Sequence, residues 1–221
     1  MDKKQLRQVV NQLAYPHGDF GLDVAAKMNE TNAFITARSI EALAPKNGEY
    51  IAELGPGNGA LSIDLVRAIG SEGRYLGIEL SDDMAISARK TLREVASARV
   101  DIHSGDCRSV SLTKASLDGL IAVNVLYFID DLDRLFNQIR PWLKPMGRCV
   151  FGIRPVRTLE SLKFHDFGHH IRSPEIIGNR LQKSGFADIS VTYHDEGEGS
   201  LGDITFPNGS IIIRAQVADE S

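Results

Sequence analysis

The chain has 221 residues, of which 43% are hydrophobic and 24% charged, and its formal net charge is −4. This length suffices for one globular domain with a substantial core, and the composition is ordinary for a soluble protein. The acidic balance and the lack of a dense basic cluster argue against a face for duplex nucleic acid, and no apolar run of about 18 residues is present that could span a membrane.

Two helices are expected before residue 45. The first covers residues 3–13, and Tyr15-Pro16-His17-Gly18 then breaks the pattern. Residues 20–44 carry apolar side chains at helical spacing. A turn at Pro45-Lys46-Asn47-Gly48 follows. We therefore expect an N-terminal helical extension or lid at 1–45 and a main domain at 46–221.

Strands and helices alternate through the first part of the main domain. The expected strands are 49–54, 74–79, 100–103, 117–125 and 148–153. Helices are expected between most of them, at 58–69, 82–97 and 130–142. Such alternation implies parallel strands joined by right-handed crossovers.

The C-terminal part breaks this alternation. A polar loop at 155–172 is followed by a helix that begins at Ser173-Pro174. Two further strands, 189–193 and 210–215, have no helix between them. We expect them to pair antiparallel as a hairpin that closes the sheet.

The most informative motif follows the first strand and reads Glu53-Leu54-Gly55-Pro56-Gly57-Asn58-Gly59. Glycines at alternate positions let the main chain turn sharply and let a ligand approach it closely. The preceding acid is costly to bury unless it meets a cation or a polar group. A dinucleotide fingerprint matches this stretch only weakly, and a glycine turn that merely packs is the third interpretation left open.

At every position these seven residues resemble the first motif of class I methyltransferases, which bind S-adenosylmethionine (SAM). The resemblance implies an α/β, Rossmann-like fold: a seven-stranded, mostly parallel sheet of order 3-2-1-4-5-7-6 with strand 7 antiparallel, helices on both faces and an N-terminal helical extension. Tyr15-Pro16-x-Gly18 and Lys27-Met28-Asn29-x-x-Asn32 further resemble small-molecule methyltransferases of ubiquinone and menaquinone biosynthesis.

The resemblance also assigns residues to SAM. Those expected to bind it are Glu53, Gly55, Gly57, Glu79, Leu80, Asp106, Cys107 and Asn124. Glu53 would lie near the amino-acid end, and Glu79 would accept the ribose hydroxyls, as acids at this place also do in NAD enzymes. Asp106 would contact the adenine amino group and Asn124 the methionine moiety. Solvated or turn-forming roles for these polar residues remain open.

Catalysis requires little of the protein here. Transfer from a sulfonium depends mainly on in-line positioning, and a base is needed only if the nucleophile keeps its proton. The candidate catalytic residues are His17, Tyr127 and His165, with Arg154 and the adjacent His169 and His170 as further polar groups near the site. No metal is expected, because adjacent histidines point apart and no matched ligands complete a set.

We therefore expect a cytoplasmic SAM-dependent methyltransferase that acts on a small molecule. The N-terminus leads into no apolar signal segment, and Cys107 and Cys149 are expected as free thiols. The alternatives are a SAM-binding sensor or partner subunit, a methyltransferase for RNA or protein, and an NAD(P)-dependent oxidoreductase. The stretch Asn124-Val125-Leu126-Tyr127 lacks the prolines typical of nucleobase amino methylation.

Overall fold

The computed structural model describes residues 3–162, 168–201 and 204–218. The helices in these ranges are α1 (Lys3–Ala14), α2 (Gly18–Leu43), α3 (Ile63–Ala68), α4 (Asp82–Val95), α5 (Leu132–Ile139), α6 (Val156–Ser161) and α7 (Pro174–Lys183). The strands are β1 (Tyr50–Leu54), β2 (Arg74–Glu79), β3 (Arg99–Ser104), β4 (Leu117–Val123), β5 (Leu143–Ile153), β6 (Phe186–Leu201) and β7 (Ile204–Val217).

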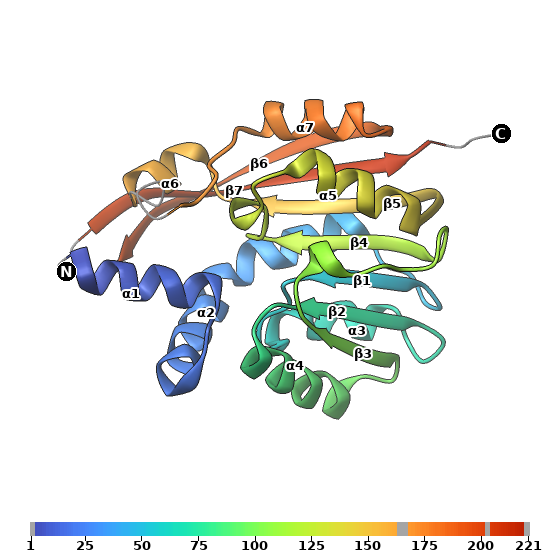
Figure 1. The fold of residues 1–221 in the computed structure, drawn as a ribbon, viewed down its shortest axis with the longest axis horizontal. Helices are drawn as coiled ribbons and strands as arrows, with labels where there is room; N and C mark the ends of the chain where they lie inside the picture. Colours follow the sequence, from blue (N-terminus) through green and yellow to red (C-terminus); the bar gives the residue numbers. More distant parts are fainter. Residues whose placement is uncertain (1–2, 163–167, 202–203, 219–221) are drawn as a thin grey trace.

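Within the described ranges, seven strands form one sheet of order β3-β2-β1-β4-β5-β7-β6. The first five strands pair in parallel, and β7 runs antiparallel to both β5 and β6. In Figure 1 the parallel strands all point toward the side where α1 and α6 lie. The expected fold class and strand order are therefore confirmed, and the carboxyl ends of β1 to β5 share one edge.

Alternating side chains build a core on each face of the sheet. On one face, Ile51 and Tyr75 pack with apolar residues of α2, α3 and α4. On the other face, Ala52 and Leu54 pack with α5 and α7. Because strand side chains alternate between faces, nearly continuous apolar strands are needed to serve both layers.

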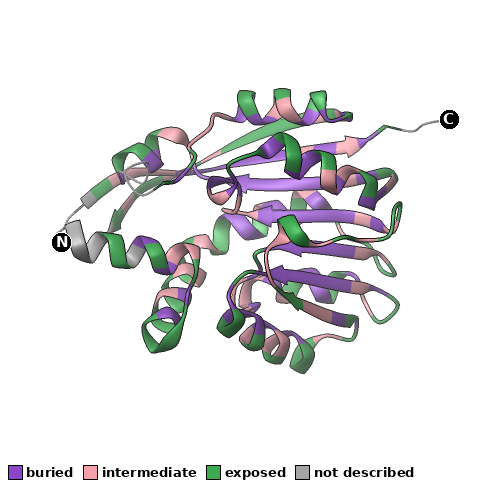
Figure 2. Ribbon diagram, viewed as in Figure 1, coloured by how far each residue is buried: buried purple, intermediate pink, exposed green. Residues whose placement is uncertain are grey.

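Helix α2 belongs partly to this core and partly to the edge. Its second half brings Ile35 and Leu43 into the buried cluster with Ile51 and Val150. Its first half is mostly exposed and lies with α1 beyond the carboxyl ends of the strands (Figures 1 and 2). The domain boundary at residue 45 stays a prediction. The second half of α2 packs against the sheet as one of the helices that cover it.

The C-terminal third differs from the expected elements in two respects. β6 and β7 pair from Phe186↔Val217 out to Leu201↔Ile204, far beyond the expected 189–193 and 210–215, with a register shift between Asp195 and Glu198. The expected loop at 155–172 also contains α6, whose Thr158 hydroxyl donates to the Pro207 carbonyl at 2.7 Å. Glycine and proline in 195–209 suggest a loop locally, but pairing along the hairpin overrides that preference.

No helix in the described part of the chain combines the length and apolar composition needed to cross a bilayer.

Candidate functional site

The three glycines of the turn after β1 all adopt left-handed backbone conformations, with φ of +69° at Gly55, +58° at Gly57 and +78° at Gly59. A Cβ atom on Gly59 would lie 3.0 Å from Ala88 Cα of α4, so this position packs helix against turn. A Cβ on Gly57 would meet no atom within 4 Å. The main chain at Gly57 is therefore open to a ligand, while that at Gly59 is closed by packing.

Glu53 precedes this turn and is buried, with 5% of its surface exposed. Its Oε2 accepts a hydrogen bond of 2.6 Å from the Tyr75 hydroxyl. Gly77 lies beside Glu53 in the β1–β2 register, and the missing side chain there leaves room for the Tyr75 ring to reach along the sheet. Burial raises the pKa of Glu53, and the Tyr75 bond opposes that rise. The polar partner that a buried Glu53 requires is thus the neutral Tyr75 phenol of the protein itself.

Glu79 ends β2 on the open side of the glycine turn. It is 6% exposed, and its two carboxylate oxygens accept the main-chain N–H groups of Gly57 and Ser81, each at 2.9 Å. Burial raises the pKa of Glu79, and these two N–H groups limit the rise by favouring the carboxylate. One acid therefore fixes the turn after β1 relative to the turn after β2. The neighbouring Leu80 is 47% exposed beside it.

Asp106 follows β3 and is engaged by its own neighbour. Both of its carboxylate oxygens accept hydrogen bonds from the Arg108 side chain, at 2.7–3.0 Å. These bonds hold the pKa of Asp106 below its ordinary value. Cys107 is half-buried, and burial raises the pKa of its thiol to about 11, so the thiol is neutral at physiological pH.

Asn124 and Tyr127 meet at the end of β4. Asn124 is held at a φ of +57°, its Nδ2 donates to Asn32 of α2 at 3.0 Å, and its Oδ1 accepts from the Tyr127 hydroxyl at 3.2 Å. The Tyr127 oxygen also accepts the main-chain N–H of Arg154. Burial raises the pKa of Tyr127. The phenol is therefore a neutral structural group that holds the β4 end against the β5 end.

Arg154, at the end of β5, ties the hairpin to α2. Its guanidinium forms an ion pair with Glu196 at 2.7 Å, with only 10% and 13% of the two side chains exposed. It also donates to the Thr31 carbonyl at 2.6 Å and the Gly209 carbonyl at 3.0 Å. Buried charges are tolerated when every donor finds such a partner.

The N-terminal turn that contains His17 docks on the end of β2. The Ser81 hydroxyl donates to the Pro16 carbonyl, and the Gly18 N–H donates to Asp83 at 2.9 Å. Ser81 also caps α4 by accepting from Met84 N–H at 3.2 Å. The His17 ring is exposed, and its Nδ1 lies 2.9 Å from the Tyr15 carbonyl. The turn is thus fixed next to Glu79, and the role of residues 1–45 as a lid stays a prediction.

The histidines predicted after β5 do not form one described cluster. His165 lies outside the described residues. His169 packs its ring 4.9 Å from that of Phe128, and the His170 N–H donates to the Tyr127 carbonyl at 2.8 Å. Among the described residues, no three His, Cys, Asp or Glu side chains gather as metal ligands do.

Three participants escaped the sequence-based prediction. They are Tyr75, which bonds Glu53, Asn32, which bonds Asn124, and Arg108, which bonds Asp106. For Tyr75 the signal was available: a tyrosine two residues before a glycine in the strand beside a buried acid. Asn32 contacts Asn124 across 92 positions, so no local pattern could have indicated it.

Comparison with known proteins shows similarity to methyltransferases. A family model described as a methyltransferase domain matches residues 51–147. The demethylmenaquinone methyltransferase of Lactococcus lactis is 21% identical over 150 residues, which cover 68% of this chain and 58% of that protein. An uncharacterised 37.1 kDa protein in transposon Tn4556 of Streptomyces fradiae is 30% identical over 113 residues, or 51% of this chain and 32% of that protein.

Among solved structures, phosphoethanolamine N-methyltransferase 2 of Haemonchus contortus, in complex with phosphomonomethylethanolamine and S-adenosylhomocysteine, superposes with a TM-score of 0.74. It is 16% identical, and the match covers 96% of this chain and 60% of that one. At this identity the likeness shows a shared fold. This chain spans less than two thirds of each of these three proteins.

Proposed function

Since this chain belongs to the class I SAM-dependent methyltransferases, we propose that it transfers a methyl group from SAM to a small-molecule acceptor by in-line displacement. The observation that carries the proposal is the open main chain at Gly57 beside the buried carboxylate of Glu79. The empty space where a Gly57 Cβ would lie suits a ligand that packs against the main chain, and the Glu79 carboxylate beside it has further lone pairs for polar groups of that ligand.

The residues of the site suit the parts of SAM. Each Glu79 oxygen accepts one N–H, and a carboxylate has further lone pairs with which to accept ribose hydroxyls. Gly57 leaves the main chain accessible to the amino-acid end, whereas a Cβ on Gly55 would lie 2.8 Å from Val125 Cγ2, so Gly55 lets the turn pack closely against the end of β4. The exposed side chain of Leu80 offers an apolar surface for the adenine ring, and Asp106 and Cys107 follow at the end of β3.

SAM supplies a methyl group on a positively charged sulfur, which leaves readily when an acceptor attacks in line. The protein then has to orient the acceptor and exclude water. We assign orientation to the end of β4, where Asn124 is locked by Asn32 and Tyr127. Tyr127 acts there as a positioning residue, because its neutral phenol is already committed to Asn124 and Arg154. His17 and His165 stay predicted bases.

A small acceptor is supported by the position of the N-terminal turn. The turn at Tyr15–Gly18 is bonded to Ser81 and Asp83, beside the end of β2, which narrows the approach for a macromolecule. The similarity to a demethylmenaquinone methyltransferase agrees with this choice.

Calorimetric titration with SAM and with S-adenosylhomocysteine tests the cofactor site. We expect dissociation constants in about the micromolar range and a loss of at least about tenfold in Glu79→Ala, because both the diol acceptor and the anchor of the glycine turn disappear. Glu72→Ala is the matched control, since it removes an exposed acid outside the site. Absence of heat with either compound in the wild-type protein would refute the proposal.

Transfer of a labelled methyl group from SAM into fractionated cell extract tests the acceptor. Label in the ultrafiltrate supports a small molecule, whereas label in precipitated RNA or protein would contradict that part of the proposal. Binding of SAM without label in any fraction would indicate a sensor or partner subunit.

A further inference from the structure

Arg108 occupies most of the carboxylate that is expected to receive adenine. Three N–H groups of Arg108 bond the Asp106 carboxylate: the main-chain N–H reaches Oδ1, Nη2 reaches Oδ2, and Nε is shared between the two oxygens. A carboxylate offers about four acceptor directions. An adenine amino group therefore competes with Arg108 for most of the acceptor directions of Asp106.

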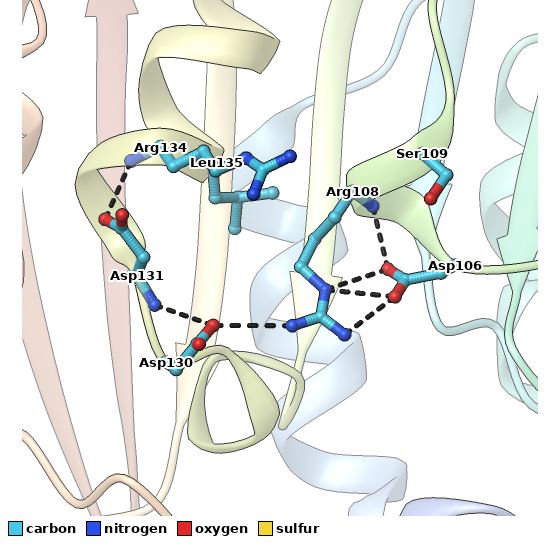
Figure 3. A pocket seen from close by; sticks show the side chains of 7 residues that line it. All are labelled: Asp106, Arg108, Ser109, Asp130, Asp131, Arg134 and Leu135. Carbon is cyan, nitrogen blue, oxygen red and sulfur yellow. Dashed lines mark hydrogen bonds and ion pairs between the residues drawn. The ribbon is translucent and has the colours of Figure 1, made fainter.

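A second acid, Asp130, lies within reach of the Arg108 guanidinium. Arg108 Nη1 lies 3.3 Å from Asp130 Oδ1, across a cavity of about 300 Å³ between the turn after β3 and the start of α5 (Figure 3). The Arg108 side chain is 41% exposed, so it can rotate without disturbing the core. Asp130 in turn accepts the Asp131 N–H at 2.9 Å, which fixes its carboxylate toward the cavity.

We propose that Arg108 competes with the adenine amino group for Asp106 and moves fully onto Asp130 when the cofactor binds, so that Arg108 sets the affinity for SAM and its product. The inference rests on the proposed function, because it takes adenine to bind at Asp106. Arg108 is a positioning residue in this scheme: it acts through Asp106. Exposed ion pairs change an equilibrium constant by at most about fivefold, so the expected effect is modest and measurable.

Calorimetric titration of Arg108→Met with S-adenosylhomocysteine and with its deaminated analogue, in which a carbonyl replaces the amino group, tests the competition. We expect about threefold tighter binding of S-adenosylhomocysteine, because the ion pair no longer has to be broken. The analogue should bind no more tightly, since its carbonyl gains nothing from a freed carboxylate and loses a donor in Arg108. A general loosening of the site would move both ligands in the same direction.

Two further variants sharpen the test. Asp130→Asn keeps the bond to the Asp131 N–H but removes the charge that receives Arg108, so it should weaken binding of S-adenosylhomocysteine. Arg134→Met is the matched control: it removes a cation from the same cavity that makes no bond to Asp106 among those described and acts on it only weakly through its charge, so it should change the affinity much less than Arg108→Met. At 1 M salt, where the Debye length is about 3 Å, the difference between wild type and Arg108→Met should shrink.

Equal or weaker binding of S-adenosylhomocysteine by Arg108→Met would overturn the inference and leave the proposed function intact. Failure of the wild-type protein to bind S-adenosylhomocysteine would instead refute the proposed cofactor site, and the inference with it.

Discussion

Each glycine of the turn after β1 is required for its own reason. Gly57 and Gly59 share a left-handed conformation, but the first faces open space and the second faces α4. An alanine at either position incurs the backbone strain of about 1 kcal/mol. Only the alanine at Gly59 also meets packed atoms.

We expect Gly57→Ala to lower the free energy of unfolding by about 1 kcal/mol and Gly59→Ala by about 2–3 kcal/mol, because its Cβ would lie 3.0 Å from Ala88 Cα and Leu92 Cγ. Urea unfolding measures both. Binding of SAM should weaken in Gly57→Ala through the Cβ that enters the ligand space. Equal stability losses in the two variants would contradict this division of roles.

Glu53 makes stability depend on pH. Its folded pKa is raised above 4.5, mainly by burial. As the pH rises through 4.5 the unfolded chain releases this proton while the folded chain keeps it, so the group's contribution to stability is lost as the pH approaches the folded pKa. Glu53→Gln lacks this titrating carboxyl group, so its stability does not change with pH through residue 53. We expect its unfolding free energy, relative to wild type, to increase as the pH rises above about 4.5, measured by urea titration.

Tyr75→Phe should change the pH dependence of stability in the opposite direction to Glu53→Gln. The Tyr75 hydroxyl lowers the Glu53 pKa, so its removal should steepen the loss of stability with rising pH. Parallel pH curves for wild type, Glu53→Gln and Tyr75→Phe would show that Glu53 is not the responsible group.

Whole elements are joined at the site by a few polar side chains. Arg154 connects β5 to α2 and to the β6–β7 hairpin through Thr31, Glu196 and Gly209. We expect Arg154→Met to destabilise the protein by about 3–5 kcal/mol, because it leaves Glu196 buried without a cation. The double variant Arg154→Met/Glu196→Gln should recover part of that loss. Guanidinium unfolding of the three proteins measures this, and additive losses would contradict a coupled pair.

Ser81 joins the N-terminal turn to α4. Its hydroxyl caps the helix and donates to the Pro16 carbonyl, whereas Ser173 caps α7 by accepting from the Ile176 N–H. Ser81→Ala and Ser173→Ala should each cost about 1 kcal/mol. Only Ser81→Ala should also speed limited proteolysis near residues 15–18, because the turn loses its anchor. Equal cleavage rates in both variants would show that Ser81 does not hold the turn.

At the scale of the whole molecule, α1 and α2 differ in how much they contribute to the hydrophobic core. Ile35 and Leu43 of α2 have no exposed surface and pack against the sheet. Deletion of residues 1–14 should leave a cooperative unfolding transition. Deletion of residues 1–45 should abolish it, because each large core side chain contributes about 2–5 kcal/mol and total stability is about 5–15 kcal/mol. Calorimetry distinguishes the outcomes, and a cooperative transition in the longer deletion would establish residue 45 as a domain boundary.

Local patterns predicted most of the fold because each one reports on its own segment. The alternation of apolar strands with helices indicated the parallel sheet, and the absence of a helix after residue 189 indicated the hairpin. The full length of β6 and β7 escaped prediction, because Gly197, Pro207 and Gly209 favour turns in isolation. Their strand conformation depends on pairing between residues distant in the sequence.

The sequence by itself determined the sheet and the glycine turn that suits a cofactor, since hydrophobic periodicity and the backbone freedom of glycine are properties of short segments. Only the tertiary structure decided which partners the charged groups take: Tyr75 for Glu53, two main-chain N–H groups for Glu79 and Arg108 for Asp106. The physical reason is that a buried or half-buried carboxylate takes whichever donor the packed chain brings within about 3 Å. That choice depends on strand register and side-chain direction across the whole sheet.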